Sequence, residues 1–147
     1  MVTIDVFVFA AIVHTLLVRM NSPTRWITVA AGFFGFTGVA LGAFGAHALK
    51  DSLTAQGTLP IWQTAVLYQL VHSAALLALA GGRDSHAGPS TKVGACWVAG
   101  IVLFSGSLYG LALGGPRFLG PITPLGGLAF LIGWALIFWN ALRSPKA

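Results

Sequence analysis

The chain has 147 residues, of which 56% are hydrophobic and only 7% are charged. A soluble globular protein carries roughly a quarter of its residues as Asp, Glu, Lys or Arg, so this composition excludes a water-soluble domain and indicates that lipid surrounds the fold. The formal charge of +5 comes from scattered Lys and Arg residues. The absence of a basic cluster argues against nucleic-acid binding.

Residues 1–25 are predicted to form an N-terminal extension with an apolar segment at 6–18. As a helix, this segment would be about 20 Å long, which is short for a membrane span. It also lacks the basic start and the small-residue cleavage site of a secretory signal. Three interpretations stay open: an interfacial or frayed helical extension, a fifth span, and a true start at Met20.

Four long stretches without charge follow the extension, at 26–49, 52–82, 93–116 and 118–142. Each exceeds the about 20 helical residues that cross a bilayer, and none alternates as a barrel strand does. Because a backbone in hydrocarbon must satisfy its own hydrogen bonds, we predict an all-α membrane bundle of four transmembrane helices. The predicted domain is 26–143, with helices at about 26–48, 60–81, 93–114 and 125–142 and a tail at 144–147.

Proline and tryptophan mark the ends of these helices. Pro121 and Pro124 predict that the fourth helix begins only near Leu125. Trp134 lies within that helix and should face either the bundle interior or lipid. The remaining tryptophans fall near predicted helix ends, where amphipathic rings favour the membrane interface. They are Trp26, Trp62, Trp97 and Trp139.

The distribution of cations predicts the orientation of the bundle. Six Lys and Arg residues fall on one side of the four spans and two on the other, and the richer side is expected in the cytoplasm together with the C-terminus. The six are Arg19, Arg25, Arg83, Lys92, Arg143 and Lys146, and the two are Lys50 and Arg117.

Two of the predicted helices carry glycines on one face. At 100° per residue, the glycines of the first helix fall within a narrow arc, and the third helix repeats the spacing. Such faces let two backbones approach closely and gain dispersion contacts. We expect them to pack helices within the chain, and a homo-oligomer or a membrane-complex partner is the alternative. The residues are Gly35, Gly38, Gly42, Gly45, Gly106 and Gly110.

The second predicted helix carries polar side chains on one arc. Polar groups in hydrocarbon are costly without partners, so this arc is expected to face the interior, where the third helix offers two polar side chains. One interpretation is an interhelical hydrogen-bond network. The other is a binding pocket or proton relay centred on the histidine. The arc contains Thr64, Tyr68, Gln69 and His72, and the expected partners are Ser105 and Tyr109.

The sequence contains no recognisable catalytic or metal-binding grouping. His47 ends the first helix and is expected at a different depth from His72. The chain has only three acidic residues, all at predicted helix ends or in loops, so no buried acid can join a Ser-His grouping. Cys96 is the single cysteine, which excludes a disulfide within the chain. We therefore expect no metal and no cofactor.

Four short blocks occur in order along the chain: LGAFGAH at 41–47, WQTAVLYQ at 62–69, FSGSLY at 104–109 and GPITPLGG at 120–127. With these blocks, residues 26–143 resemble the domain of unknown function 423 family, small multi-helix proteins of the bacterial inner membrane. The resemblance implies a location and an architecture but no reaction. It adds His47 and Thr123 to the candidate site residues, and it leaves residues 1–19 outside the family pattern.

Three functions are compatible with this sequence. The leading hypothesis is association within the bilayer, as an accessory subunit or as a lipid- or partner-binding module. The second is a small carrier or channel in which Tyr68, Gln69 and His72 line a polar path. The third is an enzyme acting on a lipid or quinone, for which the only support is that imidazole exchanges protons near neutral pH.

Overall fold

The computed structural model describes residues 25–81 and 87–143, and every element within them is helical. The N-terminal extension, with its three interpretations, and the tail lie outside the described residues. One π-helical turn, η1, joins α5 to α6, so these three elements form one continuous rod. The elements are α2 (Arg25–Ala46), α3 (Lys50–Ala55), α4 (Leu59–Gly81), α5 (Ala87–Gly100), η1 (Ile101–Ser105), α6 (Gly106–Ala112) and α7 (Leu119–Arg143).

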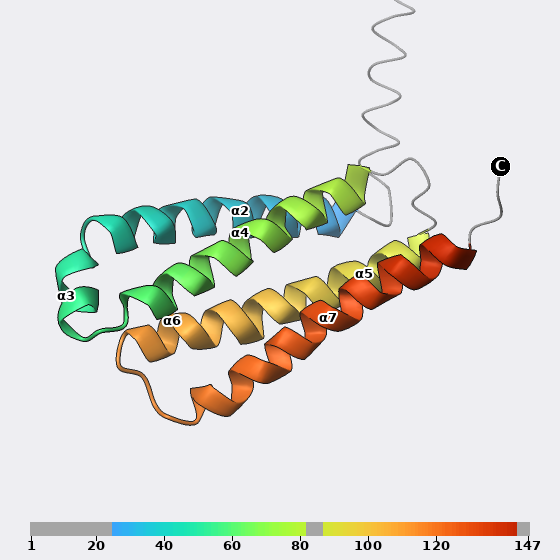
Figure 1. Ribbon diagram of the computed structural model, residues 1–147. Coiled ribbons are helices and arrows are strands. Elements are labelled where there is room, and N and C mark those ends of the chain that lie inside the picture. The colour runs from blue at the N-terminus through green and yellow to red at the C-terminus, as the bar shows by residue number, and fades with distance from the viewer. Residues whose placement is uncertain (1–24, 82–86, 144–147) are drawn as a thin grey trace, which may run out of the picture.

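Four rods in the described ranges are long and apolar enough to cross a bilayer: α2, α4, the α5–η1–α6 rod and α7. Figure 1 shows them side by side in two pairs, α2 with α4 and the α5–η1–α6 rod with α7. Large apolar side chains cover the outside of the bundle, and Phe36 and Phe138 are 77% and 67% exposed. Water would penalise that surface, whereas hydrocarbon solvates it. The predicted all-α membrane bundle of four helices is confirmed.

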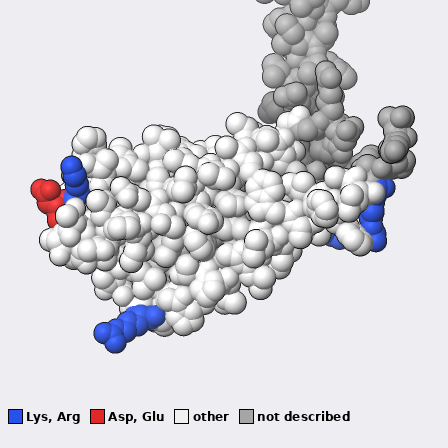
Figure 2. Space-filling view, viewed as in Figure 1, with Lys and Arg blue, Asp and Glu red and all other residues white. Residues whose placement is uncertain are grey.

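Charged side chains of the described residues lie at the two ends of the bundle. Figure 2 shows an uncharged band between these ends on the face in view. Lys50, Asp51 and Arg117 belong to the two connections at the α3 end, and Arg25 and Arg143 terminate helices at the opposite end. This separation is the one that a hydrocarbon layer across the middle of the bundle requires.

Two tryptophans that were expected at the membrane interface are instead buried. Trp62 is 3% exposed and Trp97 is 1% exposed. Each indole lies over a glycine of the neighbouring helix, Trp62 over Gly45 and Trp97 over Gly133, at a position where a Cβ atom would collide with the indole ring. The missing side chain makes room for the ring, so these two indoles pack inside the bundle and do not face the surroundings.

The last helix begins at Leu119, six residues before the predicted start. Pro121 falls in the first turn, where the backbone N–H has no helical partner, so its ring removes no hydrogen bond. Pro124 lies inside the helix and removes one. The Thr123 hydroxyl donates to the Leu119 carbonyl at 3.3 Å within the same turn. The two prolines therefore belong to the helix instead of preceding it.

The connection between α2 and α4 contains a short helix, α3, that the sequence did not predict. Leu53 of α3 is 1% exposed and packs with Trp62 and Ala112 in a small core at this end of the bundle. The Thr58 hydroxyl donates to the Ala112 carbonyl at 2.8 Å, which ties the connection to the α6 end. Gly57 then reverses the chain with a positive φ of 68°.

Candidate functional site

The glycine face of α2 lies along α4. A Cβ atom added to Gly38 would lie 2.8 Å from Leu70 Cδ2, and one added to Gly42 would lie 3.3 Å from Val66 Cγ1. Gly35 is the looser contact, at 4.0 Å from the Cβ atom of Ser73. These glycines, together with Gly45 beneath Trp62, bring the two helices close enough for α2 to act as a rigid support for the polar arc on α4.

The glycines of the third span do not form a matching face. Gly106 is exposed with nothing within 4 Å of its added Cβ atom, whereas Gly110 would place a Cβ atom 2.6 Å from Leu119 Cδ1. Two other glycines also make close contacts between this rod and α7: Gly100 lies against the ring of Phe130, and Gly126 lies against the backbone of η1. The four-residue spacing could not reveal this, because it shows which glycines share a face of α6 but not where the neighbouring helices lie.

Gln69 is the centre of the interior hydrogen-bond network. Its side chain is 3% exposed, and its Nε2 donates to the Phe34 carbonyl and to the Thr37 hydroxyl, both at 2.9 Å. Its Oε1 accepts a hydrogen bond from the Tyr109 hydroxyl at 3.0 Å. One amide therefore joins α2, α4 and α6, and both of its ends are satisfied.

His72 is 4% exposed and is held on both ring nitrogens. The indole Nε1–H of Trp134 donates to Nε2 at 3.2 Å, and Nδ1 lies 2.9 Å from the Tyr68 carbonyl. An indole can only donate, so Nε2 is the acceptor and the network assigns the proton to Nδ1, which donates to the carbonyl. The ring stacks on Phe130 with centroids 3.6 Å apart. This geometry fixes a neutral imidazole between α4 and α7.

The remaining polar side chains of the third span separate into a paired group and an unpaired one. Ser107 and Thr123 share a hydrogen bond at 2.8 Å between α6 and α7. Ser105 is fully buried, and among the described residues its hydroxyl has no hydrogen-bond partner. The expected pairing of Ser105 with the α4 arc is therefore wrong, whereas Tyr109 does reach that arc.

Two of the sequence candidates lie away from the interior. Thr64 is exposed and its hydroxyl donates to the Pro60 carbonyl at 2.9 Å, which satisfies it within its own helix. Thr64 was expected to face the interior. It precedes Gln69 by five residues, and at about 100° per residue this separates the two side chains by roughly 140° around the helix. His47 is exposed in the turn after α2. Neither contributes to the network around Gln69 and His72.

The titratable side chains of the described residues are dispersed. Within 25–81 and 87–143, no three His, Cys, Asp or Glu side chains converge on one point. Both nitrogens of His72 are already engaged, and the nearest polar groups are donors or carbonyls and not a carboxylate. These interior polar groups join the helices to one another through hydrogen bonds.

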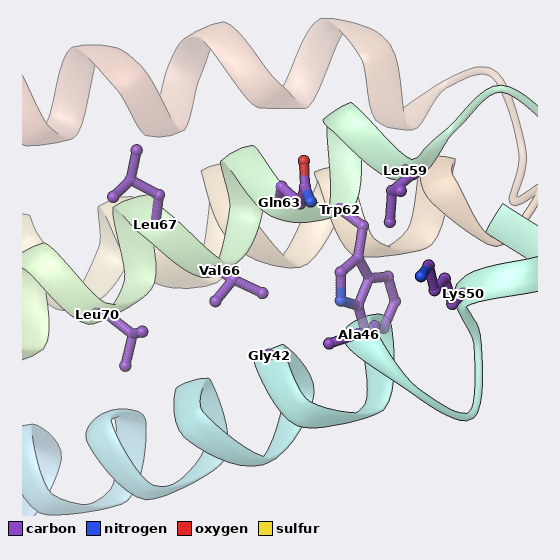
Figure 3. A pocket seen from close by; sticks show the side chains of 10 residues that line it. Gly42, Ala46, Lys50, Leu59, Trp62, Gln63, Val66, Leu67 and Leu70 are labelled. Atoms are coloured by element: carbon purple, nitrogen blue, oxygen red, sulfur yellow. The ribbon is translucent and has the colours of Figure 1, made fainter. Parts of the chain in front are cut away.

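One groove opens between α2 and α4 at the α3 end, and we call it the α2–α4 groove. It has a volume of about 430 Å³. Figure 3 shows Gly42 and Ala46 of α2 on one side, Trp62 and Val66 of α4 on the other, and the amine of Lys50 at its end. The walls are apolar except for Gln63, and Lys50 lies at the α3 end of the groove.

A second groove of about 580 Å³ lies between α4, η1 and α7, and we call it the mid-membrane groove. Tyr68 and His72 line it from α4, and Phe104 of η1 and Phe130 and Trp134 of α7 complete its aromatic wall. The rings contact one another, with Tyr68 and Phe104 centroids 4.6 Å apart. Of these residues, the sequence singled out Tyr68 and His72 for the site. The sequence analysis did not include Trp134 in the site, although the central position of Trp134 in the last span distinguished it from the other tryptophans.

Residues 41–127 match the model of the family described as "protein of unknown function (DUF423)". The chain belongs to this family. The match includes Gln69, His72 and Tyr109, and it ends before Trp134. No solved structure gives a significant match to the chain.

Curated relatives of this DUF423 protein cover most of its length. The "UPF0382 membrane protein YwdK" of Bacillus subtilis is 44% identical over 107 residues, which cover 71% of this chain and 86% of the relative. The "UPF0382 inner membrane protein YgdD" of Escherichia coli K12 is 42% identical over 124 residues, which cover 84% of this chain and 94% of the relative. Both names agree with the membrane bundle described above.

Proposed function

We propose that this protein is a lipid-binding module of the bacterial inner membrane, which holds an anionic phospholipid in the α2–α4 groove. The observation that carries the proposal is the position of Lys50 at the α3 end of a groove whose other lining residues are apolar except for Gln63. A phospholipid has the complementary structure, with a negative phosphate at the membrane surface and an acyl chain below it. The "inner membrane" names of the relatives support this location.

The length of the α2–α4 groove suits one acyl chain. Along α4 it extends from Leu59 to Leu70, and eleven residues at 1.5 Å each give about 16 Å. One leaflet of hydrocarbon is roughly 15 Å thick, half of the usual bilayer core. The chain would therefore end near the middle of the membrane, while its phosphate stays within reach of Lys50. Asp51 follows Lys50 but does not line the groove.

The positions of the cations suggest which leaflet supplies the lipid. We propose that the C-terminus is cytoplasmic, because Arg25, Lys92 and Arg143 outnumber Lys50 and Arg117 at the opposite end. The mouth of the α2–α4 groove would then open toward the outer leaflet of the inner membrane.

The carrier hypothesis has less support than lipid binding. A polar path needs groups that can exchange partners with a passing solute, whereas Gln69 and His72 already have partners on every polar side-chain atom. Breaking such interhelical bonds in hydrocarbon costs free energy that a narrow bundle cannot recover from water. The same argument weakens the enzyme hypothesis, because His72 has no free nitrogen to serve as a base.

Native mass spectrometry of the detergent-purified protein tests the proposal. Phosphatidylglycerol and phosphatidylcholine with identical acyl chains are added at equal concentration, and the bound fraction of each is measured. We expect phosphatidylglycerol to be preferred about fivefold, because one cation near the membrane surface contributes about 1 kcal/mol toward an anionic lipid. Lys50→Gln should remove the preference. Arg117→Gln, which removes a cation from another connection at the same end, should retain it.

A second pair of variants tests the groove walls. Ala46→Phe fills the α2–α4 groove and should reduce binding of both lipids, whereas Ala43→Phe adds the same ring to an exposed position of α2 outside the groove. Equal binding of the two lipids by the wild type, or the same loss from Lys50→Gln and Arg117→Gln, would contradict the proposal. A dimer with Ala46 at its interface would show that a second copy, and not a lipid, occupies the groove.

A further inference from the structure

The mid-membrane groove lies at the depth of the bilayer centre. Tyr68 follows Leu59 by nine residues, which places it about 13 Å along α4 at 1.5 Å per residue. Half of the hydrocarbon core is roughly 15 Å thick, so this side chain is nearly as far from water as the bilayer allows. The groove volume of about 580 Å³ falls within the range of small-molecule sites.

The Tyr68 hydroxyl is a hydrogen-bond donor without a partner in this groove. Its side chain is 40% exposed and lines the groove, and within the described residues its hydroxyl makes no hydrogen bond. The other polar groups at the groove are occupied, because the Trp134 N–H donates to His72 and the imidazole donates to the Tyr68 carbonyl. Hydrocarbon cannot satisfy the phenol, and an unpaired hydroxyl there costs free energy. The groove thus offers one donor and requires an acceptor.

We infer that the mid-membrane groove binds a quinone-type ligand, a planar ring with carbonyl oxygens on an apolar tail, and that the Tyr68 hydroxyl donates to one of those oxygens. Aromatic side chains form most of the wall and suit a flat ring, with Phe104 and Phe130 beside Tyr68. An acyl chain of a membrane phospholipid has only methylene groups at this depth, since its ester carbonyls lie near the membrane surface. It would fill the groove but leave the phenol unpaired. The inference concerns binding, and no electron transfer is part of it.

Quenching of intrinsic tryptophan fluorescence measures this binding, because Trp134 lines the groove. The probe is decylubiquinone, a benzoquinone with a ten-carbon tail, titrated into the full-length protein in dodecyl maltoside. We expect saturable quenching, and Tyr68→Phe should raise the Kd roughly fivefold, the loss typical of one hydrogen bond. Tyr109→Phe is the matched control, since that hydroxyl donates to Gln69 in the interior and its loss should leave the Kd unchanged.

A second pair of variants fills the groove without touching a hydroxyl. The added Cβ atom of Gly127 would lie 3.7 Å from Phe104 Cδ2, an ordinary contact, so Gly127→Leu should fold and occupy the groove. It should abolish saturable quenching, and the quenching that remains measures partition of the probe into detergent. Gly32→Leu adds the same side chain to an exposed position with nothing within 4 Å, and it should bind as the wild type does.

Three results would overturn the inference. The first is quenching of the wild type that does not saturate. The second is an equal Kd for Tyr68→Phe and Tyr109→Phe, which would mean that the phenol contacts no acceptor. The third is equal competition by decylbenzene, which has the ring and tail but no carbonyl, because the groove would then select only for apolar bulk. A dimer that buries Tyr68 would give the first result and would identify a second copy as the occupant.

Discussion

A double-mutant cycle on Gln69 and Tyr109 tests whether the interior network is structural. Gln69→Leu keeps a similar side-chain volume but removes all three hydrogen bonds of the amide, to the Phe34 carbonyl, the Thr37 hydroxyl and the Tyr109 hydroxyl. Tyr109→Phe removes only the last of these bonds. The Phe34 carbonyl belongs to α2, so it remains part of that helix when the Gln69 amide is removed.

The magnitudes follow from the count of hydrogen bonds. Interhelical hydrogen bonds in membranes average about 0.6 kcal/mol each, with a maximum of about 1.7. Tyr109→Phe should therefore lower the free energy of unfolding by about 0.6 kcal/mol, and Gln69→Leu by roughly 2 kcal/mol. The double variant should cost little more than Gln69→Leu alone, because the bond between the two residues is already lost. The coupling free energy should then be about 0.6 kcal/mol.

Equilibrium unfolding in mixed dodecyl maltoside and SDS micelles, followed by circular dichroism, provides the four free energies. Tyr68→Phe is the control, because it removes a hydroxyl that makes no hydrogen bond to any described residue. It should not lower the stability in the absence of added ligand. A coupling of zero between Gln69 and Tyr109 would refute the reasoning, since the two side chains would then stabilise the fold independently of their contact.

Three further predictions concern packing, burial and orientation. Gly45→Ala should destabilise the fold by about 1–3 kcal/mol, because the new methyl group displaces the Trp62 indole from its hydrogen bond to the Leu41 carbonyl of α2. Gly32→Ala, at an open position, should cause no loss, and thermal unfolding in detergent measures both variants. Ser105→Ala should raise the stability by about 1 kcal/mol in the same assay, because it removes a buried hydroxyl that has no partner among the described residues. A loss of stability would contradict this and reveal a hydrogen-bond partner. A green fluorescent protein fused to the C-terminus should fluoresce and an alkaline phosphatase fusion there should be inactive; the reverse pattern would invert the bundle.

The number and type of helices could be predicted from the sequence because hydrocarbon imposes a simple rule. Uncharged stretches of sufficient length must be helical, and the structure has a rod for each of them. The start of α7 could not be predicted, since Pro121 and Pro124 occur both before helices and in their first turns. α3 was missed for a different reason, because the side chain that anchors it, Leu53, is the one large apolar residue of a polar segment.

The candidate site was predicted in part. The sequence identified Gln69, His72 and Tyr109, because a polar residue in a membrane span needs a partner and there are few to choose from. It could not identify Trp134 as the partner of His72, since a tryptophan in a span is compatible with lipid, interface or core. It also placed Thr64 in the interior, but Thr64 is about 140° from Gln69 on the helical wheel and is exposed.

The π turn at Ile101–Ser105 shifts the phase between the two halves of the third span. At its end the Gly106 N–H donates to the Ile101 carbonyl five residues earlier, so the turn accommodates one residue more than an α-helix would. If the same residues were wound as an α-helix, α6 would be rotated by about 100° relative to α5. Tyr109 and Ser107 would then point away from their partners on α4 and α7. The π conformation of this segment is thus as important to the assembled bundle as its composition.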